Sequence, residues 1–178
     1  MTITLIDNIN IEVVNGDITR QPDCDAIVNA ANAQLKSGGG VAGAVHRIGD
    51  PDLEERTRKF APIKTGEAVI TSAPNFPNKY IIHCLGPVYG KDKPEDQFLK
   101  SCYTNALKLA DDNELQSIAF PAISTGIFGY PVEDAAKVAA EVFKAVAPGL
   151  TCITIIRMVL WSKEDCTIHN EVFKSILS

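Results

Sequence analysis

The sequence has little positive charge, no long apolar run and no paired cysteine motif. Its formal net charge of −5 argues against duplex DNA or an anionic membrane as the main partner, because both attract basic surfaces. No segment approaches the length that spans a bilayer, and no positively charged start precedes an apolar run as in a secretory signal. We therefore expect a protein of the cytoplasm that does not act at membranes.

The five cysteines are scattered along the chain, and no two form a C-x-x-C motif. An odd number without regular spacing is typical of reduced thiols inside the cell rather than of a disulfide framework. The three histidines do not cluster with the cysteines, so we expect no metal site and no bound cofactor. These residues are Cys24, Cys84, Cys102, Cys152, Cys166, His46, His83 and His169.

The length of 178 residues suits one domain, and no internal repeat or low-complexity linker divides it. We therefore predict a single domain over residues 1–178. Short β-rich runs predict strands, and amphipathic periodicity predicts helices. The predicted strands are 3–6, 9–14, 26–30, 68–72, 80–85, 117–120 and 151–160, and the predicted helices are 41–48, one opening at Asp50-Pro51, 95–112, 131–146 and 162–177.

Strands and helices alternate after an opening hairpin. This order is typical of an α/β protein, and we predict a three-layer α/β/α sandwich with a mixed central sheet. In such sheets ligands bind beyond the carboxyl ends of the strands. Two glycine-rich loops, 38–43 and 124–129, follow predicted strands and are the first candidates for a site.

The loop 38–43 matches the G-x-G-x-x-G pattern of dinucleotide-binding folds, but its context differs. Seven residues, 31–37, separate the strand from Gly38, and no acidic residue ends a strand about 20 residues later, near Ile63. We therefore set the dehydrogenase interpretation aside. Consecutive glycines still allow backbone N–H groups to approach an anion, and the following helix adds the positive end of its dipole.

The loop from Ser124 to Gly129 repeats this chemistry with two glycines and two hydroxyl groups ahead of a helix. Neither glycine-rich stretch contains Lys or Arg. Two such loops facing one cleft would hold a diphosphate through neutral donors.

Polar residues follow two other strands. Asp17 is either the first residue of an Asx turn or a carboxylate that accepts from an exocyclic amine such as adenine N6. Asn29 and Asn32 are three residues apart at a strand exit, where they either contact a polyol such as ribose or cap local turns.

The combination of these segments resembles the macrodomain family, and in particular its stand-alone bacterial, archaeal and viral-type hydrolases. The resemblance covers nearly the whole chain. Each segment alone is common, but their order and spacing together are specific. The segments are 14–19, 27–32, 38–41 and 119–129.

The resemblance implies that ADP-ribose or its ester derivatives are the ligand, with ADP-ribosylated proteins as partners and nucleic acid only through ADP-ribosylated ends. Asp17 and Ile18 would contact the adenine, and Asn29, Ala30 and Asn32 the distal ribose. The glycine loop would line that ribose and the adjacent phosphate, and the second loop would surround the diphosphate. The residues of the two loops are Gly38, Gly39, Gly40, Val41, Ser124, Thr125, Gly126, Ile127 and Phe128.

One departure from the family concerns catalysis. Many catalytic relatives carry Asp where this sequence has Ala42, although others, including viral ones, share Gly-Gly-Gly-Val-Ala-Gly and are similar to active hydrolases. In those, the ligand's phosphate is proposed to orient water, and a residue matching Asn32 to position the ribose. We therefore expect either an ADP-ribosyl ester hydrolase, active on O-acetyl-ADP-ribose or mono-ADP-ribosylated acidic side chains, with Asn32 as its catalytic residue, or a non-catalytic ADP-ribose-binding module.

Four further residues are given no catalytic role, and His83 among them is predicted to be structural. His83 and Cys84 are adjacent in a strand, so their side chains point to opposite faces and form no dyad. His46 follows the glycine loop and is predicted to pack rather than to catalyse. Trp161 ends a strand and is predicted to lie in the core.

Overall fold

A seven-stranded mixed sheet is the centre of the computed structural model, which describes residues 2–178. The strands are β1 (Thr2–Ile6), β2 (Ile9–Asn15), β3 (Ala26–Ala30), β4 (Ala68–Ser72), β5 (Tyr80–Cys84), β6 (Ser117–Phe120) and β7 (Ile155–Leu160). Their order across the sheet is β1-β2-β7-β6-β3-β5-β4. The outermost strands, β1 and β4, run antiparallel to their neighbours, and the pairs between β2 and β5 are parallel.

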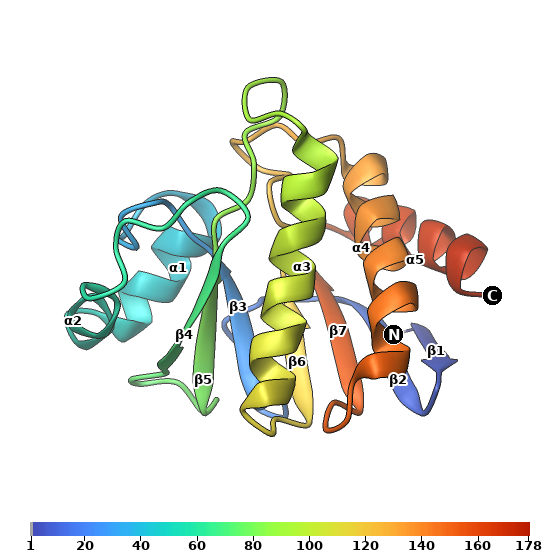
Figure 1. The fold of residues 1–178 in the computed structure, drawn as a ribbon, viewed down its shortest axis with the longest axis horizontal. Coiled ribbons are helices and arrows are strands. Elements are labelled where there is room, and N and C mark those ends of the chain that lie inside the picture. The colour runs from blue at the N-terminus through green and yellow to red at the C-terminus, as the bar shows by residue number, and fades with distance from the viewer. Residues whose placement is uncertain (1) are drawn as a thin grey trace.

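Helices cover both faces of this sheet (Figure 1). They are α1 (Gly40–Gly49), α2 (Asp52–Thr57), α3 (Glu95–Asp112), α4 (Val132–Val146) and α5 (Lys163–Leu177), with a short 3₁₀ turn at Ala147–Gly149. Alternate residues of β3 show the layering. Val28 packs in a cluster with residues of α3, α4 and α5, whereas Ile27 packs with Val45 of α1 and Leu53 of α2. The predicted α/β/α sandwich with a mixed sheet is confirmed.

The predicted elements match the observed ones except at their ends. The largest difference is at β7, which begins at Ile155 rather than at residue 151. The carboxylate of Asp111, at the end of α3, accepts backbone N–H groups of Thr151, Cys152 and Ile153 at 2.7–3.2 Å. These backbone N–H groups therefore cannot form hydrogen bonds to a neighbouring strand, and residues 151–153 form a loop.

The crossover from β2 to β3 is a second departure from a simple α/β pattern. It passes from one side of β7 and β6 to the other, yet residues 16–25 form turns rather than a helix. Ile18 and Cys24 of this segment are buried in the same apolar cluster as Val45 and Leu53. The segment thus covers β7 and β6 on the face that carries α1 and α2.

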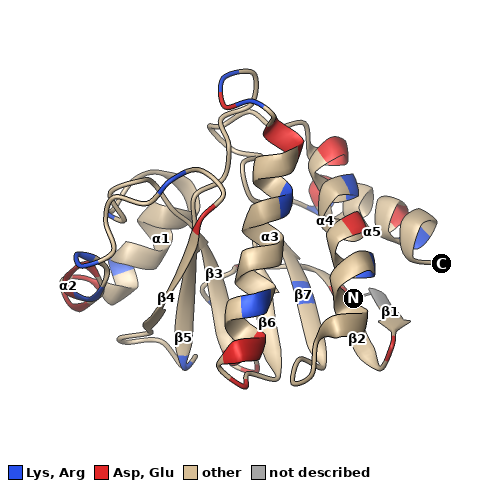
Figure 2. Cartoon of the chain, in the orientation of Figure 1, with Lys and Arg blue, Asp and Glu red and all other residues tan. Residues whose placement is uncertain are grey.

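No helix within residues 2–178 is both long and apolar enough to cross a membrane. Charged residues lie mainly on the helices and loops, and the strands carry few of them (Figure 2). Strand β7 has a single charged residue, Arg157, which gives the blue band on this strand in Figure 2.

A buried polar cluster lies between β3, β4 and β5 on the α1 face. His83 of β5 is fully buried, with its Nδ1 3.2 Å from Asn29 Nδ2 and its Nε2 3.0 Å from Thr71 Oγ1. Since the Asn29 amide nitrogen only donates, Nδ1 accepts and Nε2–H donates to the threonine hydroxyl. Burial, with a smaller contribution from nearby His46, lowers the pKa of His83 to about 3. His83 is therefore a neutral structural residue.

This depressed pKa predicts a pH dependence of stability. The unfolded chain takes up a proton at His83 near pH 6.5, whereas the folded chain does not until about pH 3. The stabilisation from neutral His83 is therefore complete above pH 6.5 and declines as the pH falls, by at most about 1.4 kcal/mol per pH unit. We expect the stability advantage of wild type over His83→Gln to shrink between pH 7 and pH 4.5 in urea unfolding. Parallel stability curves would contradict this assignment.

Candidate functional site

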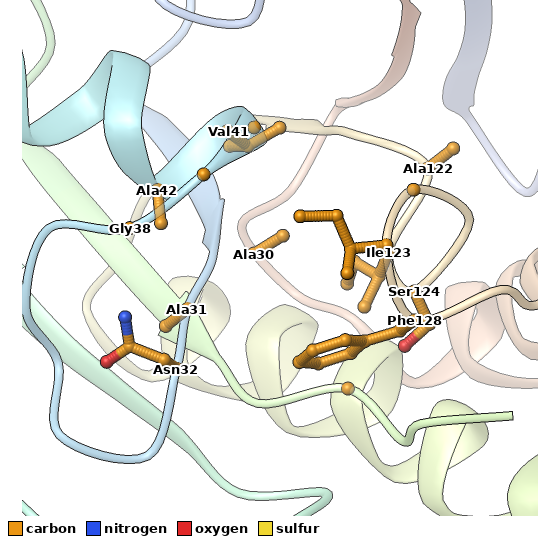
Figure 3. A pocket seen from close by; sticks show the side chains of 15 residues that line it. Ala30, Ala31, Asn32, Gly38, Val41, Ala42, Ala122, Ile123, Ser124 and Phe128 are labelled. Atoms are coloured by element: carbon orange, nitrogen blue, oxygen red, sulfur yellow. The ribbon is translucent and has the colours of Figure 1, made fainter.

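A pocket opens at the carboxyl-end edge of the sheet, between the start of α1 and the loop that follows β6 (Figure 3). Its volume is about 190 Å³. Within the described chain, no charged side chain lines it, and the only polar side chains that do are those of Asn32 and Ser124. The lining residues are Ala30, Ala31, Asn32, Gly38, Gly39, Gly40, Val41, Ala42, Gly86, Ala122, Ile123, Ser124, Gly126, Ile127 and Phe128.

Parallel pairing explains why these segments meet. β3 pairs with β6 on one side and with β5 on the other, all three in the same direction. Their carboxyl ends therefore lie side by side, and the residues after them, including Ala31, Gly86 and Ala122, line one pocket. The sequence predicted this edge as the site, and the structure brings both glycine-rich loops to it.

The amino end of α1 forms one wall of the pocket. Gly39 is the N-cap residue, no side chain caps the helix, and its first turn has no acidic residue. The first N–H groups of a helix have no partner within it. Gly40 adopts a φ of +55°, a conformation that glycine tolerates without strain. The result is a concave backbone surface with the positive end of a helix dipole, suited to an anion.

Ser124 provides the polar group on the opposite wall. Its backbone has a φ of +68°, which is uncommon for a residue with a side chain. Its hydroxyl oxygen is buried and has no hydrogen-bond partner within the described chain. A Cβ atom on Gly86 would collide with this hydroxyl and with the Ile123 side chain, so a larger residue at this position would displace Ser124 or Ile123. A strained serine with an unsatisfied hydroxyl at a pocket wall is the arrangement expected of a ligand contact.

Asn32 lines the pocket with its amide held in place. Its Nδ2 donates to the Lys36 carbonyl at 2.8 Å, and its Oδ1 accepts the Lys36 N–H at 3.1 Å. The side chain therefore closes the turn that leads to the glycine loop, and in Figure 3 it lies beside Ala31 below Ala42. One amide hydrogen and one oxygen lone pair are left for a ligand.

Aromatic and aliphatic side chains complete the pocket. The ring of Phe128 extends across it toward Ala31 and Asn32 (Figure 3), and it packs against a small apolar cluster that includes Ala31 and Leu35. Ile127 is 89% exposed at the mouth. A Cβ on Gly39 would lie 3.2 Å from Ile127 Cδ1, so the two loops touch across the opening.

Asp17 and Ile18 lie outside the pocket lining but near the same edge, just after β2. Asp17 Oδ1 accepts the N–H and the hydroxyl of Thr19, at 2.9 and 2.7 Å, so the Asx turn is present. Asp17 Oδ2 lies 4.0 Å from the Arg20 guanidinium and accepts no hydrogen bond from the described residues. Ile18 is buried in the cluster that also packs against Val41 at the start of α1. One carboxylate oxygen of Asp17 is therefore free to accept.

Two of the predicted ligand residues turn away from the pocket. Asn29 precedes Ala30 in β3, and strand alternation directs its side chain beneath α1 to His83 rather than to the cleft. The assignment of Asn29 to the distal ribose is therefore corrected. Thr125 uses its hydroxyl to bond the Ala122 carbonyl at 2.8 Å and is not among the lining residues.

His46 packs as the sequence predicts. It is buried, and its Nδ1 lies 2.9 Å from both carboxylate oxygens of Asp50. The prediction for Trp161 is wrong, because its side chain is 81% exposed. Trp161 comes directly after β7. It lies beside Asn15, whose Nδ2 donates to the Trp161 carbonyl at 3.0 Å.

Some lining residues were not predicted from the sequence. Ala31, Ala42, Ala122 and Ile123 carry no polar group, so nothing in their chemistry marks them as site residues. Gly86 had a usable signal, because a glycine directly after a buried strand often marks a close approach of two backbones. Within residues 2–178, no group of three or more His, Cys, Asp or Glu side chains is placed to hold a metal ion.

Comparison with known proteins gives one consistent result. The sequence model of the Macro domain matches residues 28–139. A macro domain-containing protein of Caldanaerobacter subterraneus subsp. tengcongensis is 42% identical over 171 residues, which cover 93% of this chain and 97% of that protein.

Solved structures agree. A mutant of the Oceanobacillus iheyensis macrodomain with ADPR superposes with a TM-score of 0.92 at 35% identity, covering 98% of this chain and 97% of that one. The Trypanosoma brucei macrodomain in complex with ADP-ribose gives a TM-score of 0.82 at 32% identity, covering 92% of this chain and 68% of that one. This chain belongs to the macrodomain family.

Proposed function

We propose that this protein binds ADP-ribose along the carboxyl-end edge of its sheet and hydrolyses esters at the distal ribose. The observation that carries the proposal is the uncapped amino end of α1, whose glycine backbone lines a pocket without charged side chains. Such a surface holds a diphosphate through N–H groups and the helix dipole. The unsatisfied hydroxyl of Ser124 supplies a further donor on the opposite wall.

The distance between the pocket and Asp17 supports an elongated ligand. At about 190 Å³ the pocket is smaller than the roughly 300–1,000 Å³ of a typical small-molecule site, so it holds only part of the ligand. Asp17 follows β2, which β7 separates from β6 and β3. With strands about 4.8 Å apart, the two places are separated by roughly 10–14 Å. ADP-ribose has an adenine at one end and a ribose at the other, joined by a diphosphate, and the Trypanosoma brucei relative is in complex with it.

The groups around Asp17 suit the adenine. The free Oδ2 accepts a hydrogen bond from the exocyclic amine, while Thr19 keeps the carboxylate oriented through Oδ1. The exposed indole of Trp161 lies at the same strand ends and offers an aromatic face for the base. The distal ribose then falls in the pocket beside Asn32 and Phe128.

Catalysis in this proposal depends on placement rather than on a general base. No carboxylate lines the pocket within the described residues, and Ala42 stands where many relatives carry Asp. Asn32 positions the ribose, and the ligand's own phosphate orients the water. Water adds to the ester carbonyl carbon and the acyl carbon–oxygen bond breaks, which gives a free acid and ADP-ribose. The same absence of a carboxylate favours the second candidate, an ADP-ribose-binding module without turnover.

The first prediction concerns the ligand. We expect ADP-ribose to bind more tightly than AMP or NAD. AMP lacks the part of the ligand that fills the pocket, and in NAD the distal ribose carries a nicotinamide, whereas in ADP-ribose it is free. Calorimetry with the three ligands measures this, and the fluorescence of Trp161, the only tryptophan, provides a second readout. Equal affinities for AMP and ADP-ribose would show that the pocket contributes nothing and would overturn the proposal.

The second prediction concerns Asp17. Asp17→Ala should weaken ADP-ribose binding by roughly one to two powers of ten, since a hydrogen bond to a charged group is worth about 1.5–3 kcal/mol. Asp17→Asn is the matched control, because its Oδ1 still accepts the Thr19 N–H and keeps the turn. If Asp17→Asn binds as wild type does, the carboxylate serves the turn alone and does not contact the base.

The third prediction concerns turnover. Asn32→Ala should lower the single-turnover rate of ADP-ribose release much more than it lowers ADP-ribose affinity, because misplacement affects the transition state most. Ala42→Asp should leave affinity nearly unchanged, and it raises the rate if its carboxylate reaches the water. The substrates are O-acetyl-ADP-ribose and a protein ADP-ribosylated on acidic side chains.

Two outcomes are informative, and one control is required. No release by wild type above buffer refutes the enzyme and leaves the binding module. Release with a full rate in Asn32→Ala shows that catalysis uses other residues. Since Asn32 also holds the Lys36 turn, thermal unfolding of the variant must match wild type for the comparison to be valid.

A further inference from the structure

The segment that carries Asp17 is held by a buried polar chain that starts in the middle of the sheet. Arg157 of β7 is only 8% exposed, and its guanidinium Nε donates to Glu12 Oε2 at 2.6 Å. Its Nη1 donates to Gln21 Oε1 at 2.9 Å, and its Nη1 and Nη2 both bind the Asp23 carboxylate. Glu12 and Arg157 are register partners of neighbouring parallel strands. The guanidinium is therefore fixed by the sheet itself.

Gln21 connects this cation to the residue proposed to contact adenine. It is 7% exposed, and its Nε2 donates to the Asp17 carbonyl oxygen at 2.8 Å. A guanidinium has only donors, so the glutamine must turn its oxygen toward Arg157. The amide nitrogen is then directed at Asp17. The donor groups of the Arg157 guanidinium thus determine which end of the Gln21 amide faces the loop.

Apart from the backbone bond between Gly16 and Leu160 and the burial of Ile18 in the apolar cluster beneath α1, the other supports of this loop are local. The Asp17 carbonyl accepts the Arg20 N–H at 3.0 Å, and Asp17 Oδ1 accepts from Thr19, all within the same turn. These bonds shape the turn but do not place it relative to the sheet. Gly16 N donates to the Leu160 carbonyl at 2.9 Å and anchors the turn at one end. Gln21 anchors the Asp17 peptide itself.

We propose that Gln21 and Arg157 are positioning residues for nucleobase recognition, which set the Asp17 carboxylate at the place where it reads the 6-amino group of adenine. The proposal rests on the proposed function, because it assumes that the ligand places its base at Asp17. The predicted consequence is specific: disturbing Gln21 should reduce discrimination between a 6-amino and a 6-oxo purine. A structural role alone would lower stability and leave that discrimination unchanged.

The test compares ADP-ribose with inosine diphosphate ribose, whose purine carries a 6-oxo group in place of the 6-amino group and a proton on N1. In wild type the 6-oxo oxygen and the Asp17 carboxylate would face each other as two acceptors with no hydrogen between them, so ADP-ribose should bind more tightly. Gln21→Glu keeps the side-chain shape and an acceptor for Arg157 but presents an oxygen to the Asp17 carbonyl. Gln21→Met removes both bonds and leaves Arg157 paired with Glu12 and Asp23.

A matched control lies at the other end of the same crossover. Asp25 Oδ2 accepts the Gln116 and Ser117 N–H groups at 2.8 and 3.3 Å, so it also ties this segment to the sheet, far from Asp17. Asp25→Asn should lower the melting temperature without changing either affinity. Affinities are measured by calorimetry well below the melting temperature of each variant.

We expect both Gln21 variants to bind ADP-ribose about tenfold more weakly and to lose most of the preference over the inosine analogue. If a folded Gln21 variant keeps the wild-type preference, the positioning role is refuted while the ADP-ribose site stands. If wild type itself fails to bind ADP-ribose, the proposed function fails, whatever the variants do. If wild type binds ADP-ribose but does not prefer it over the analogue, Asp17 does not read the 6-amino group and the positioning role is refuted, while ADP-ribose binding stands. If Gln21→Glu does not fold, Gln21→Met decides the result.

Discussion

Parallel pairing of β2, β7, β6, β3 and β5 is the constraint on which the site depends. It brings five carboxyl ends to one edge, so loops far apart in the chain line a single cleft. The two antiparallel strands, β1 and β4, lie outside this set and contribute nothing to the pocket lining. Moving one parallel strand out of register would separate the glycine loop from the loop after β6.

Neutral chemistry distinguishes this cleft from the surfaces that usually attract phosphates. A chain with a net charge of −5 cannot attract a diphosphate through its overall field. In the proposed binding mode the donors are instead the backbone N–H groups of the glycine loop and the start of α1, and the apolar side chains around them lower the local dielectric. Ser124, held at a φ of +68° with an unsatisfied hydroxyl, adds a donor whose placement depends on the missing Cβ of Gly86.

The α1 face of the sheet contains two buried polar clusters with different consequences. The cluster of Asn29, His83 and Thr71 is enclosed beneath α1, and its members mainly satisfy one another. The cluster around Arg157 instead extends through Gln21 to the loop at the edge of the cleft. Both replace apolar packing, but only the second transmits the rigidity of the sheet to a residue proposed to contact the ligand.

The sequence alone determined the α/β/α fold, the edge of the sheet where the candidate site lies and most of the residues that line its pocket. The fold and the edge follow from local signals, namely apolar periodicity, helix starts and consecutive glycines, which act over a few residues, whereas the individual ligand residues follow from the resemblance to macrodomains. Tertiary structure decided which side chains face the cleft. Asn29 and Asn32 look equivalent in the sequence, but strand alternation buries the first, while the second follows the end of β3 and remains at the pocket. Trp161 is 81% exposed although it directly follows the buried end of β7. Gln21 meets Arg157 only because the crossover passes over β7, and this contact joins residues distant in sequence, which no local pattern encodes.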